Sequence, residues 1–424
     1  MAGRGGDGAR GGVWRGPKGT RDVYASEMLR RRYIEEVWRA VSVRHGFEEV
    51  DGPTFETSEL YAVKSGEGIL GELFQAFSGK DAGEVERVKE TGRGEFALRP
   101  EFTPTLARMY AARAKQLPKP VRWFQIGPFF RAEKPQRGRL REFLQWNCDV
   151  VSEDRDVAYD AEIMILALSA LRDFGVPSDR INVAVGHRDL LRSVLIPVMG
   201  IPYDSVEDAI VELDQLSKRG LEATARALVR LGGEPDQVDN YLKTAGTPSA
   251  FAKGWKDIFN RTGFDPNDWR EYDASIDGDW FLRDLDKFFP ILRDSGYLSS
   301  FLLDQLMARG LAYYTGLVFE MISDGERAIA GGGRYDNLIE LFGGPSTPAV
   351  GFAMGDVVLG LLLEEKGLMP GDGELAGAVD AVRRSYSLRP EVFVVGNGDD
   401  GGGGGENCEG MVTPLVSALR RGVE

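Results

Sequence analysis

A basic loop between two largely apolar runs carries residues that could hold a charged ligand. The runs at 121–130 and 143–150 predict two strands, and the loop at 131–141 has five basic residues against one acidic residue. Strand alternation places four side chains of the second run on one face: Phe143, Gln145, Asn147 and Asp149. This combination suits a phosphate-bearing ligand with a cationic or amine-bearing partner. An ordinary exposed hairpin with a solvated basic tip is equally compatible with the spacing.

Three other segments concentrate arginine, tyrosine, glycine or carboxylate side chains. They are residues 98–103 (LRPEFT), 308–316 (ARGLAYYTG) and 331–336 (GGGRYD). Each also has a purely structural interpretation. Tyr313 and Tyr314 could be core residues, Glu101 lies near two prolines and fits a turn, and three glycines alone are a weak phosphate-binding motif.

The surrounding sequence predicts an antiparallel sheet with flanking helices, which is an α+β fold. Helices are expected from Ser26, as N-cap, to about residue 46, within 54–66, from about 104 to 115, and at 157–174, 337–342 and 356–366. Strands are expected at 47–53, 96–100, 181–185, 317–322, 327–330 and 349–355, with a hairpin turn at Asp324 and Gly325. Residues 80–94 are expected to be a loop, residues 331–334 to open a helix, and residues 371–386 to be a linker.

Composition limits the class of protein. The chain has 424 residues, a net charge of −14, 42% hydrophobic and 28% charged residues, so we expect a soluble globular protein. The net charge argues against diffuse nucleic-acid binding but allows a local basic patch. No apolar run approaches the roughly 18 residues of a membrane span. Two cysteines and two histidines support neither a disulfide framework nor a metal site. The expected location is the reducing cytoplasm, although the short Gly- and Arg-rich N-terminal segment leaves organellar targeting open.

In their order, these segments closely resemble the histidyl-tRNA synthetase family of class II aminoacyl-tRNA synthetases. The sequence FRAE at 130–133 opens a hairpin similar to the second class II motif. Residues 54–67, with Pro53, are similar to the dimer-forming first motif, and residues 351–355 lie where the third motif begins. Residues 309–316 and 331–335 are similar to two histidine-specific signatures. The resemblance covers residues 16–368 and implies a histidine–tRNA ligase. It further implies that ATP is a substrate, that Mg²⁺ accompanies ATP, and that tRNA(His) accepts the histidine. The protein is expected to be a homodimer and not to associate with a membrane.

The resemblance implies a role for each motif residue. Arg131 would hold the α-phosphate of ATP while the histidine carboxylate attacks it, and Arg309 would be the second cation, at the α-phosphate or at the carboxylate. The residues around histidine would be Glu101, Thr103, Gln145, Asp149, Tyr313 and Tyr314, with Asp149 and Tyr314 at the imidazole nitrogens. The residues around ATP would be Arg131, Glu133, Arg139, Gly331, Gly332 and Gly333. The residues at the tRNA acceptor end would be Lys134, Gln136, Arg137 and Arg141.

The resemblance also divides the chain. We expect a disordered tail at 1–15, a catalytic domain at 16–189 and 291–370, a helical insertion at 190–290, a linker at 371–390 and a truncated anticodon-binding domain at 391–424. The last segment contains a glycine run at 401–405 that cannot pack a core. We therefore expect good adenylate formation but weak tRNA charging, because a second hold on the tRNA would be lost.

Two positions depart from the common family pattern. Ala312 stands where many relatives have an acid, and Val358 stands where many have an arginine that clamps ATP. Both features resemble a subset of the family found in plants and some bacteria, so they do not indicate inactivation.

Two other functions fit parts of the pattern. A non-catalytic paralogue that regulates ATP phosphoribosyltransferase shares the catalytic fold, and a synthetase-like interaction domain would turn over no ligand. Arg131, Arg309 and the intact basic loop argue against the paralogue, because a histidine sensor needs no α-phosphate clamp. The co-occurrence of the pocket residues argues against the interaction domain.

Overall fold

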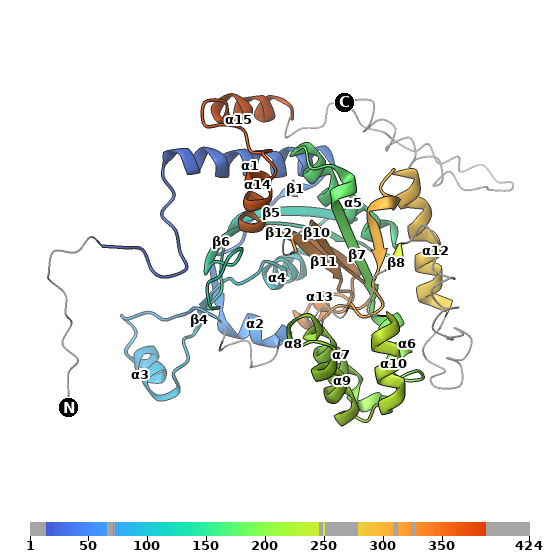
Figure 1. Ribbon diagram of the computed structural model, residues 1–424. Helices are drawn as coiled ribbons and strands as arrows, with labels where there is room; N and C mark the ends of the chain where they lie inside the picture. The colour runs from blue at the N-terminus through green and yellow to red at the C-terminus, as the bar shows by residue number, and fades with distance from the viewer. Residues whose placement is uncertain are drawn as a thin grey trace.

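The computed structural model describes residues 14–65, 71, 73–245, 249–250, 279–307, 313–323 and 328–386. Within them, the main sheet has nine strands in the order β1-β5-β6-β12-β11-β10-β7-β9-β8 (Figure 1). The strands are β1 (Glu48–Glu49), β5 (Val121–Phe130), β6 (Glu142–Val151), β7 (Ile181–His187), β8 (Ser249–Ala250), β9 (Phe301–Leu303), β10 (Leu317–Ser323), β11 (Ala330–Arg334) and β12 (Ala349–Gly355). The predicted α+β fold is confirmed. The sheet is antiparallel except for two parallel pairs, β1–β5 and β7–β9.

The predicted central hairpin is also confirmed. Strands β5 and β6 pair over their full length, from Val121 opposite Val151 to Phe130 opposite Glu142. Strand β6 pairs with β12 on its other edge. Because both edges of β6 are hydrogen-bonded, its register is fixed, and each of its side chains points to a defined face of the sheet.

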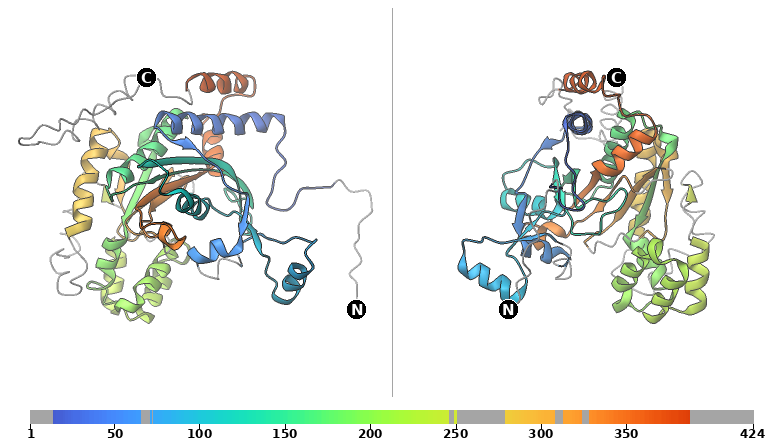
Figure 2. Two further views of the ribbon diagram at one scale, coloured as in Figure 1. Left: turned by 180° about the vertical axis from the view of Figure 1, so that it is seen from behind. Right: turned by 60° about the vertical axis from the view of Figure 1, so that its left-hand side comes forward.

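Helices pack on both faces of this sheet (Figures 1 and 2). The larger core lies between the sheet and α1 (Ala25–Arg44), α5 (Ala158–Asp173), α12 (Asp279–Asp294), α14 (Asp356–Glu365) and α15 (Leu375–Arg384). Its centre is Trp146 of β6, which stacks on Trp38 with ring centroids 5.8 Å apart and meets Phe352 edge-on at 4.9 Å. A smaller core involves α4 (Thr103–Arg113) and α13 (Leu338–Leu341) on the opposite face.

Residues 188–245 form a helical group with its own core. The helices are α6 (Arg188–Leu195), α7 (Val206–Asp214), α8 (Leu216–Arg219), α9 (Leu221–Arg230) and α10 (Pro235–Ala245). Figure 2 shows this group below the main sheet. The domain boundaries that we expect from the sequence stay predictions.

A small second sheet lies beside the main one, and here one prediction was wrong. Strands β2 (Phe55–Thr57), β4 (Phe96–Leu98) and β3 (Gln75–Ala76) form it, and α2 (Ser58–Ser65) follows β2. Residues 80–94, expected to be a loop, contain the helix α3 (Ala82–Thr91). The Asp81 side chain caps α3 by accepting from the backbone N–H of Gly83 and Glu84, and Gly92 ends the helix with a φ of 68°. These two capping residues were the signal in the sequence.

The start of α1 and the strand after it also differ from the prediction. Helix α1 has Tyr24 as its N-cap, and the hydroxyl of Ser26 instead donates to Glu27 inside the helix (3.2 Å). The strand expected at 47–53 is shortened to the two residues of β1.

Residues 331–334 were expected to open a helix, but they belong to β11. This strand pairs with β10 on one edge and with β12 on the other. A Cβ at Gly332 would lie 2.0 Å from the carbonyl oxygen of Gly351, so only glycine allows the strands to approach this closely. Pairing on both edges therefore holds the glycines extended. The expected turn at residues 324 and 325 lies outside the described residues.

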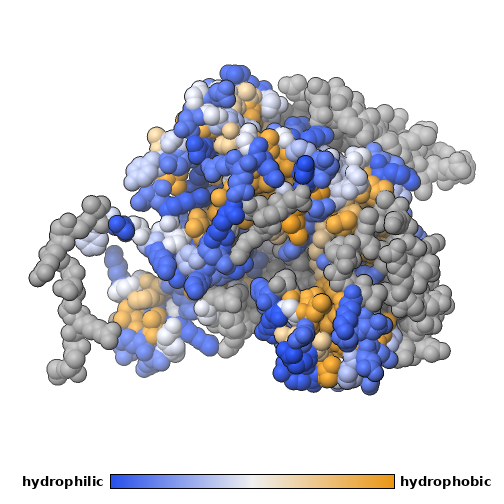
Figure 3. Space-filling view, viewed as in Figure 1, coloured by the Kyte–Doolittle hydropathy of each residue, from blue (hydrophilic) through white to orange (hydrophobic). Residues whose placement is uncertain are grey.

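The expected linker at 371–386 contains α15, which packs along α1. Leu375 and Val379 are buried against the larger core, and Glu36 of α1 accepts hydrogen bonds from Arg383 (3.1 Å) and Tyr386 (2.8 Å). The edge of the molecule where α1 and α15 lie is mostly hydrophilic (Figure 3). In the described part of the chain, no helix has the length and apolar content needed to span a bilayer.

Candidate functional site

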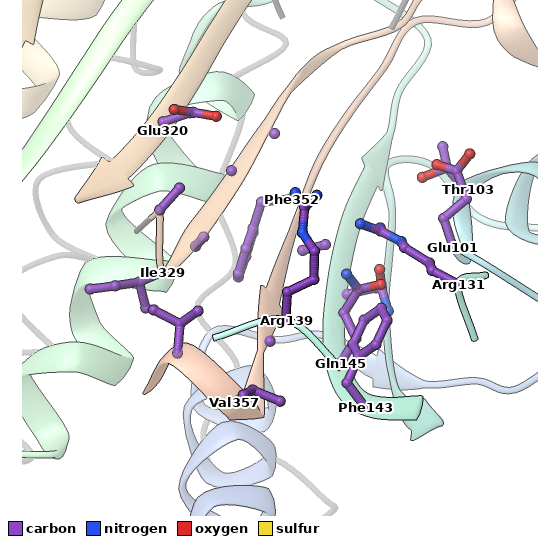
Figure 4. Close-up of a pocket in the computed structure, with 18 of the residues that line it drawn as sticks. Glu101, Thr103, Arg131, Arg139, Phe143, Gln145, Glu320, Ile329, Phe352 and Val357 are labelled. Atoms are coloured by element: carbon purple, nitrogen blue, oxygen red, sulfur yellow. The ribbon is translucent and has the colours of Figure 1, made fainter. Parts of the chain in front are cut away.

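A cavity of about 1000 Å³ lies on the face of the sheet formed by β6, β12, β11 and β10 (Figure 4). The structure brings most of the expected site residues together around it. Those that line it are Glu101, Thr103, Arg131, Gln136, Arg139, Gln145, Asp149, Tyr313, Tyr314, Gly331 and Gly332. Glu133, Lys134, Arg137, Arg141 and Gly333 are not part of its lining. Arg309 and Ala312 lie outside the described residues.

One wall of the cavity is the polar face of β6. The alternating side chains of Phe143, Gln145, Asn147 and Asp149 all line it, as strand alternation predicts. Gln145, Asn147 and Asp149 are at most 7% exposed. Gly351 of β12 faces Asp149 in the register, and a Cβ there would lie 1.9 Å from Oδ1 of Asp149. Glycine at position 351 therefore leaves the space that this carboxylate occupies.

The phenol of Tyr335 donates a hydrogen bond to the carboxylate of Asp149. Tyr335 is buried, and this burial, together with the negative charge of Asp149, raises the pKa of its phenol well above the usual value. The phenol therefore stays protonated and remains a donor. The sequence reasoning missed Tyr335 as a site residue, although it stands directly after the GGGR segment.

Three tyrosines are grouped at this end of the cavity. The rings of Tyr313 and Tyr314 lie 4.5 Å apart, and Tyr313 meets Tyr335 edge-on at 6.0 Å. A Cβ at Gly333 would lie 2.9 Å from Cδ1 of Tyr314. Gly333 therefore allows close packing behind Tyr314, and its expected place around ATP stays a prediction.

Two arginines extend toward the middle of the cavity, as Figure 4 shows for Arg131 and Arg139. Nε of Arg131 donates to the carbonyl of Pro100 (3.2 Å), and its guanidinium lies 5.2 Å from the ring centre of Phe143. These contacts hold Arg131 next to Glu101. Arg139 forms an ion pair with Glu133 (2.5 Å), which places Glu133 behind Arg139.

The rest of the basic loop is folded against the body of the protein. Arg137 forms an ion pair with Glu365 of α14. Nε of Arg141 donates to the carbonyl of Glu133 (3.1 Å), and its backbone N–H donates to Gly19 of the N-terminal segment (2.8 Å). Lys134, Gln136 and Arg137 are exposed, and of these three only Gln136 lines the cavity.

The far side of the cavity is mainly apolar. Ile322, Ile329, Phe352, Val357 and Val358 line it. Val358, where the family resemblance led us to expect an arginine, is thus part of an apolar wall. The sequence reasoning assigned no role to these residues, because isolated aliphatic side chains give no signal of ligand binding. Glu320 and Lys218 add one charge of each sign to the lining.

A buried ion-pair network holds the segment that carries Tyr313 and Tyr314. Arg334 forms an ion pair with Asp160, and both are at most 2% exposed. Arg334 also pairs with Asp336 (3.2 Å), and its carbonyl accepts from the backbone N–H of Thr315 (2.8 Å). Burial raises the pKa of the Asp160 carboxyl, and the charge of Arg334 opposes that rise.

In the described part of the chain, no group of three or more His, Cys, Asp or Glu side chains is placed to hold a metal ion. The cavity does hold three carboxylates, from Glu101, Asp149 and Glu320.

Comparisons with known proteins show the family to which the chain is similar. The family model described as histidyl-tRNA synthetase matches residues 19–260 and 270–356. A protein of Haloarcula marismortui named histidine–tRNA ligase is 36% identical over 362 residues, which are 84% of this chain and 76% of that protein. An Arabidopsis thaliana protein named histidine–tRNA ligase, chloroplastic/mitochondrial, is 33% identical, with 84% of this chain and 68% of that protein covered. The solved structure of a histidine–tRNA ligase subunit from Alicyclobacillus acidocaldarius aligns with a TM-score of 0.64 and 27% identity, covering 84% of this chain and 99% of that chain.

The buried pair of Arg334 and Asp160 yields a stability prediction. Arg334→Met should lower the free energy of unfolding by about 3–5 kcal/mol, because it leaves the Asp160 carboxylate buried without its cation. Arg334→Met combined with Asp160→Leu should recover part of that loss. Thermal and urea unfolding of the three proteins test this, and a double variant no more stable than Arg334→Met would contradict it.

Proposed function

Because the chain belongs to the histidyl-tRNA synthetase family, we propose that this protein is a histidine–tRNA ligase. It activates L-histidine with ATP to histidyl-adenylate and then transfers histidine to the 3′ end of tRNA(His). The observation that carries the proposal is the composition of the cavity: a buried carboxylate held by Tyr335 lies in the same cavity as two arginines. The carboxylate suits an imidazole N–H, and the arginines suit a phosphate.

In the first step, an oxygen of the histidine carboxylate attacks the α-phosphorus of ATP, and pyrophosphate leaves. This reaction needs positioning and charge stabilisation more than covalent help from the protein. Arg131 is the cation at the α-phosphate, because its contact with Pro100 aims the guanidinium into the cavity. Arg309 is the second cation, as the family resemblance implies.

Histidine is recognised at the end of the cavity that contains the tyrosines. Asp149 accepts from one imidazole nitrogen, and Tyr314 contacts the other, while Tyr313 lines the same pocket. The α-ammonium is bound by Glu101, Thr103 and Gln145, which line the cavity with Asp149. A carboxylate, a hydroxyl and an amide oxygen all accept hydrogen bonds from an ammonium group.

ATP occupies the part of the cavity between Arg131 and the apolar wall. Arg139, backed by Glu133, contacts the phosphates, and the ribose lies over Gly331 and Gly332, where no side chain intervenes. The apolar wall that includes Val358 suits the adenine base in place of an arginine clamp. The Mg²⁺ that we expect from the family is held mainly by the phosphate oxygens of ATP.

The tRNA acceptor end is contacted by the exposed residues of the basic loop, Lys134, Gln136 and Arg137, with Arg141 fixing the base of the loop. Lys134, Arg137 and Arg141 add positive charge in a chain whose net charge is −14. We expect the protein to be located in the cytoplasm. We also assign it to a subset of the family on the basis of Ala312 and Val358.

The alternative, a regulatory paralogue of ATP phosphoribosyltransferase, is not favoured. Relatives from several archaea, a bacterium and a plant that match most of this chain are named histidine–tRNA ligases. The cavity also retains Arg131 and Arg139, which a protein that only senses histidine does not need.

The first functional prediction concerns the amino acid. ATP–pyrophosphate exchange should depend on L-histidine and should be lower by roughly 10⁴-fold with glutamine, because glutamine leaves buried polar groups unpaired. The assay measures exchange of labelled pyrophosphate into ATP for each amino acid. Equal stimulation by histidine and glutamine would refute the proposal.

The second prediction concerns the two arginines. Arg131→Ala and Arg309→Ala should each lower the exchange rate by about 10²-fold or more, because each removes a cation at developing phosphate charge. Arg44→Ala, which breaks a surface ion pair with Asp173, serves as the control and should leave exchange unchanged. Near-normal exchange in Arg309→Ala would show that its assigned role is wrong.

The third prediction concerns assembly. We propose a homodimer through the segment around residues 53–67, where Phe55 is 54% exposed in the single chain. Sedimentation should give twice the 46.7 kDa mass of the chain. Phe55→Asp should shift the protein toward monomer, while Tyr203→Asp, on the distant helical group, should not. A fully active monomer would contradict the proposal.

A further inference from the structure

A hydrogen-bonded chain runs from Asp51, two residues after β1, to the wall of the cavity. Oδ1 of Asp51 accepts from Nη1 of Arg99 (2.7 Å) and from Nε2 of Gln125 (3.1 Å). Oε1 of Gln125 in turn accepts from Nδ2 of Asn147 (3.1 Å). Asn147 lines the cavity on β6 between Gln145 and Asp149. The functional assignments above use neither Asp51 nor Arg99 nor Gln125.

Arg99 is the buried centre of this chain. It is 1% exposed, its guanidinium lies 4.8 Å from the ring centre of Phe129, and it donates to the carbonyls of Gly52 (3.1 Å) and Pro128 (3.0 Å). A buried guanidinium is stable only when a carboxylate balances its charge. In the described part of the chain, its ion-pair partner is Asp51, whose side chain is 64% exposed, so the pair joins a buried guanidinium to a carboxylate at the surface.

The backbone of Arg99 transmits this position to the cavity. Its N–H donates to the carbonyl of Thr54, and its carbonyl accepts from Phe130, both at 2.9 Å. The next residue, Pro100, accepts from Arg131 (3.2 Å). Glu101 and Thr103, which line the cavity, follow directly in the chain. A shift of Arg99 would therefore move these two side chains relative to Gln145.

The space around the network is already filled. A Cβ at Gly127 would lie 2.4 Å from Nη2 of Arg99 and 2.4 Å from Nε2 of Gln125. A side chain at position 127 of β5 would displace the Arg99 guanidinium and the Gln125 amide. Glycine at this position therefore leaves the space that the two groups occupy.

We propose that Asp51, Arg99 and Gln125 are positioning residues that set the amine-binding side of the cavity. Asp51 fixes Arg99, which places Glu101 and Thr103, and Gln125 fixes Asn147 beside Gln145. Glu101 and Thr103, which would hold the α-ammonium of histidine, are thereby linked to Asp51 through Arg99. Asn147, which neighbours Gln145 on the same face of β6, is linked to the same Asp51 oxygen through Gln125. This inference rests on the proposed function, since it concerns the same ligand.

The test is histidine binding by isothermal titration of the full chain, with histidine KM and kcat from pyrophosphate exchange. Asp51→Ala should weaken histidine binding at least about tenfold, because several hydrogen bonds lose their acceptor. Asp51→Asn keeps an acceptor oxygen and should recover part of the affinity. A purely structural role would lower the melting temperature and the active fraction without raising the KM of the folded protein.

The matched control is Glu49→Ala. This substitution breaks the ion pair between Glu49 and Arg39 (2.9 Å), neither of which lines the cavity. Histidine affinity should therefore be unchanged. If Asp51→Ala does not fold, Gln125→Leu breaks the chain while Arg99 keeps its carboxylate, and it should also raise the histidine KM. Histidine affinity and KM within twofold of the unchanged protein, in a folded Asp51→Ala or Gln125→Leu variant, would overturn the inference. Absence of histidine-dependent exchange in the unchanged protein would instead overturn the proposed function, and the inference with it.

Discussion

A carboxylate buried in the middle of a nine-stranded sheet is costly unless it is hydrogen-bonded, and the candidate site is arranged around this constraint. Asp149 is 4% exposed, and its partners include the phenol of Tyr335. Gly351 leaves room for the carboxylate, and the hydrogen-bonded edges of β6 fix its direction. A polar group that is already paired and immobile binds a ligand with little loss of conformational freedom. The same arrangement that lets the sheet tolerate Asp149 therefore prepares it for a ligand.

Two buried arginines beside the cavity are likewise held by partners. Arg99 pairs with Asp51 and directly precedes the segment with Glu101, while Arg334 pairs with Asp160 and directly precedes Tyr335. In both cases a buried guanidinium is paired with a carboxylate, which is exposed for Asp51 and buried for Asp160, and the backbone of that arginine lies next to a cavity side chain. Such pairs contribute little net stability. Their contribution here is a defined position for the residues that follow them in the chain.

The sequence predicted the elements whose apolar and polar residues alternate with a regular period. The alternation in β5 and β6 predicted the hairpin and the shared face of Gln145 and Asp149 correctly, because period two follows from strand geometry. Residues 331–334 were misinterpreted as the start of a helix. Glycine is needed there because β10 and β12 approach β11 closely on its two edges, through residues that are distant from the glycines in sequence. Helix α15 was missed for a related reason, since its stability comes from packing on α1. The apolar wall with Val358 and the bond between Tyr335 and Asp149 likewise depend on tertiary contacts that no local pattern reveals.

The central claim is that Asp149 and Tyr314 hold the two imidazole nitrogens of histidine in this cavity. Titration calorimetry with L-histidine and with its two ring-N-methyl isomers tests the claim directly, because each methyl group blocks one nitrogen and leaves the α-ammonium and carboxylate unchanged. The account predicts that histidine binds and that both isomers bind at least about a hundredfold more weakly, since each leaves one buried polar group without its partner. Binding of either isomer as tightly as histidine would show that the nitrogen it blocks is not held, and would contradict the account.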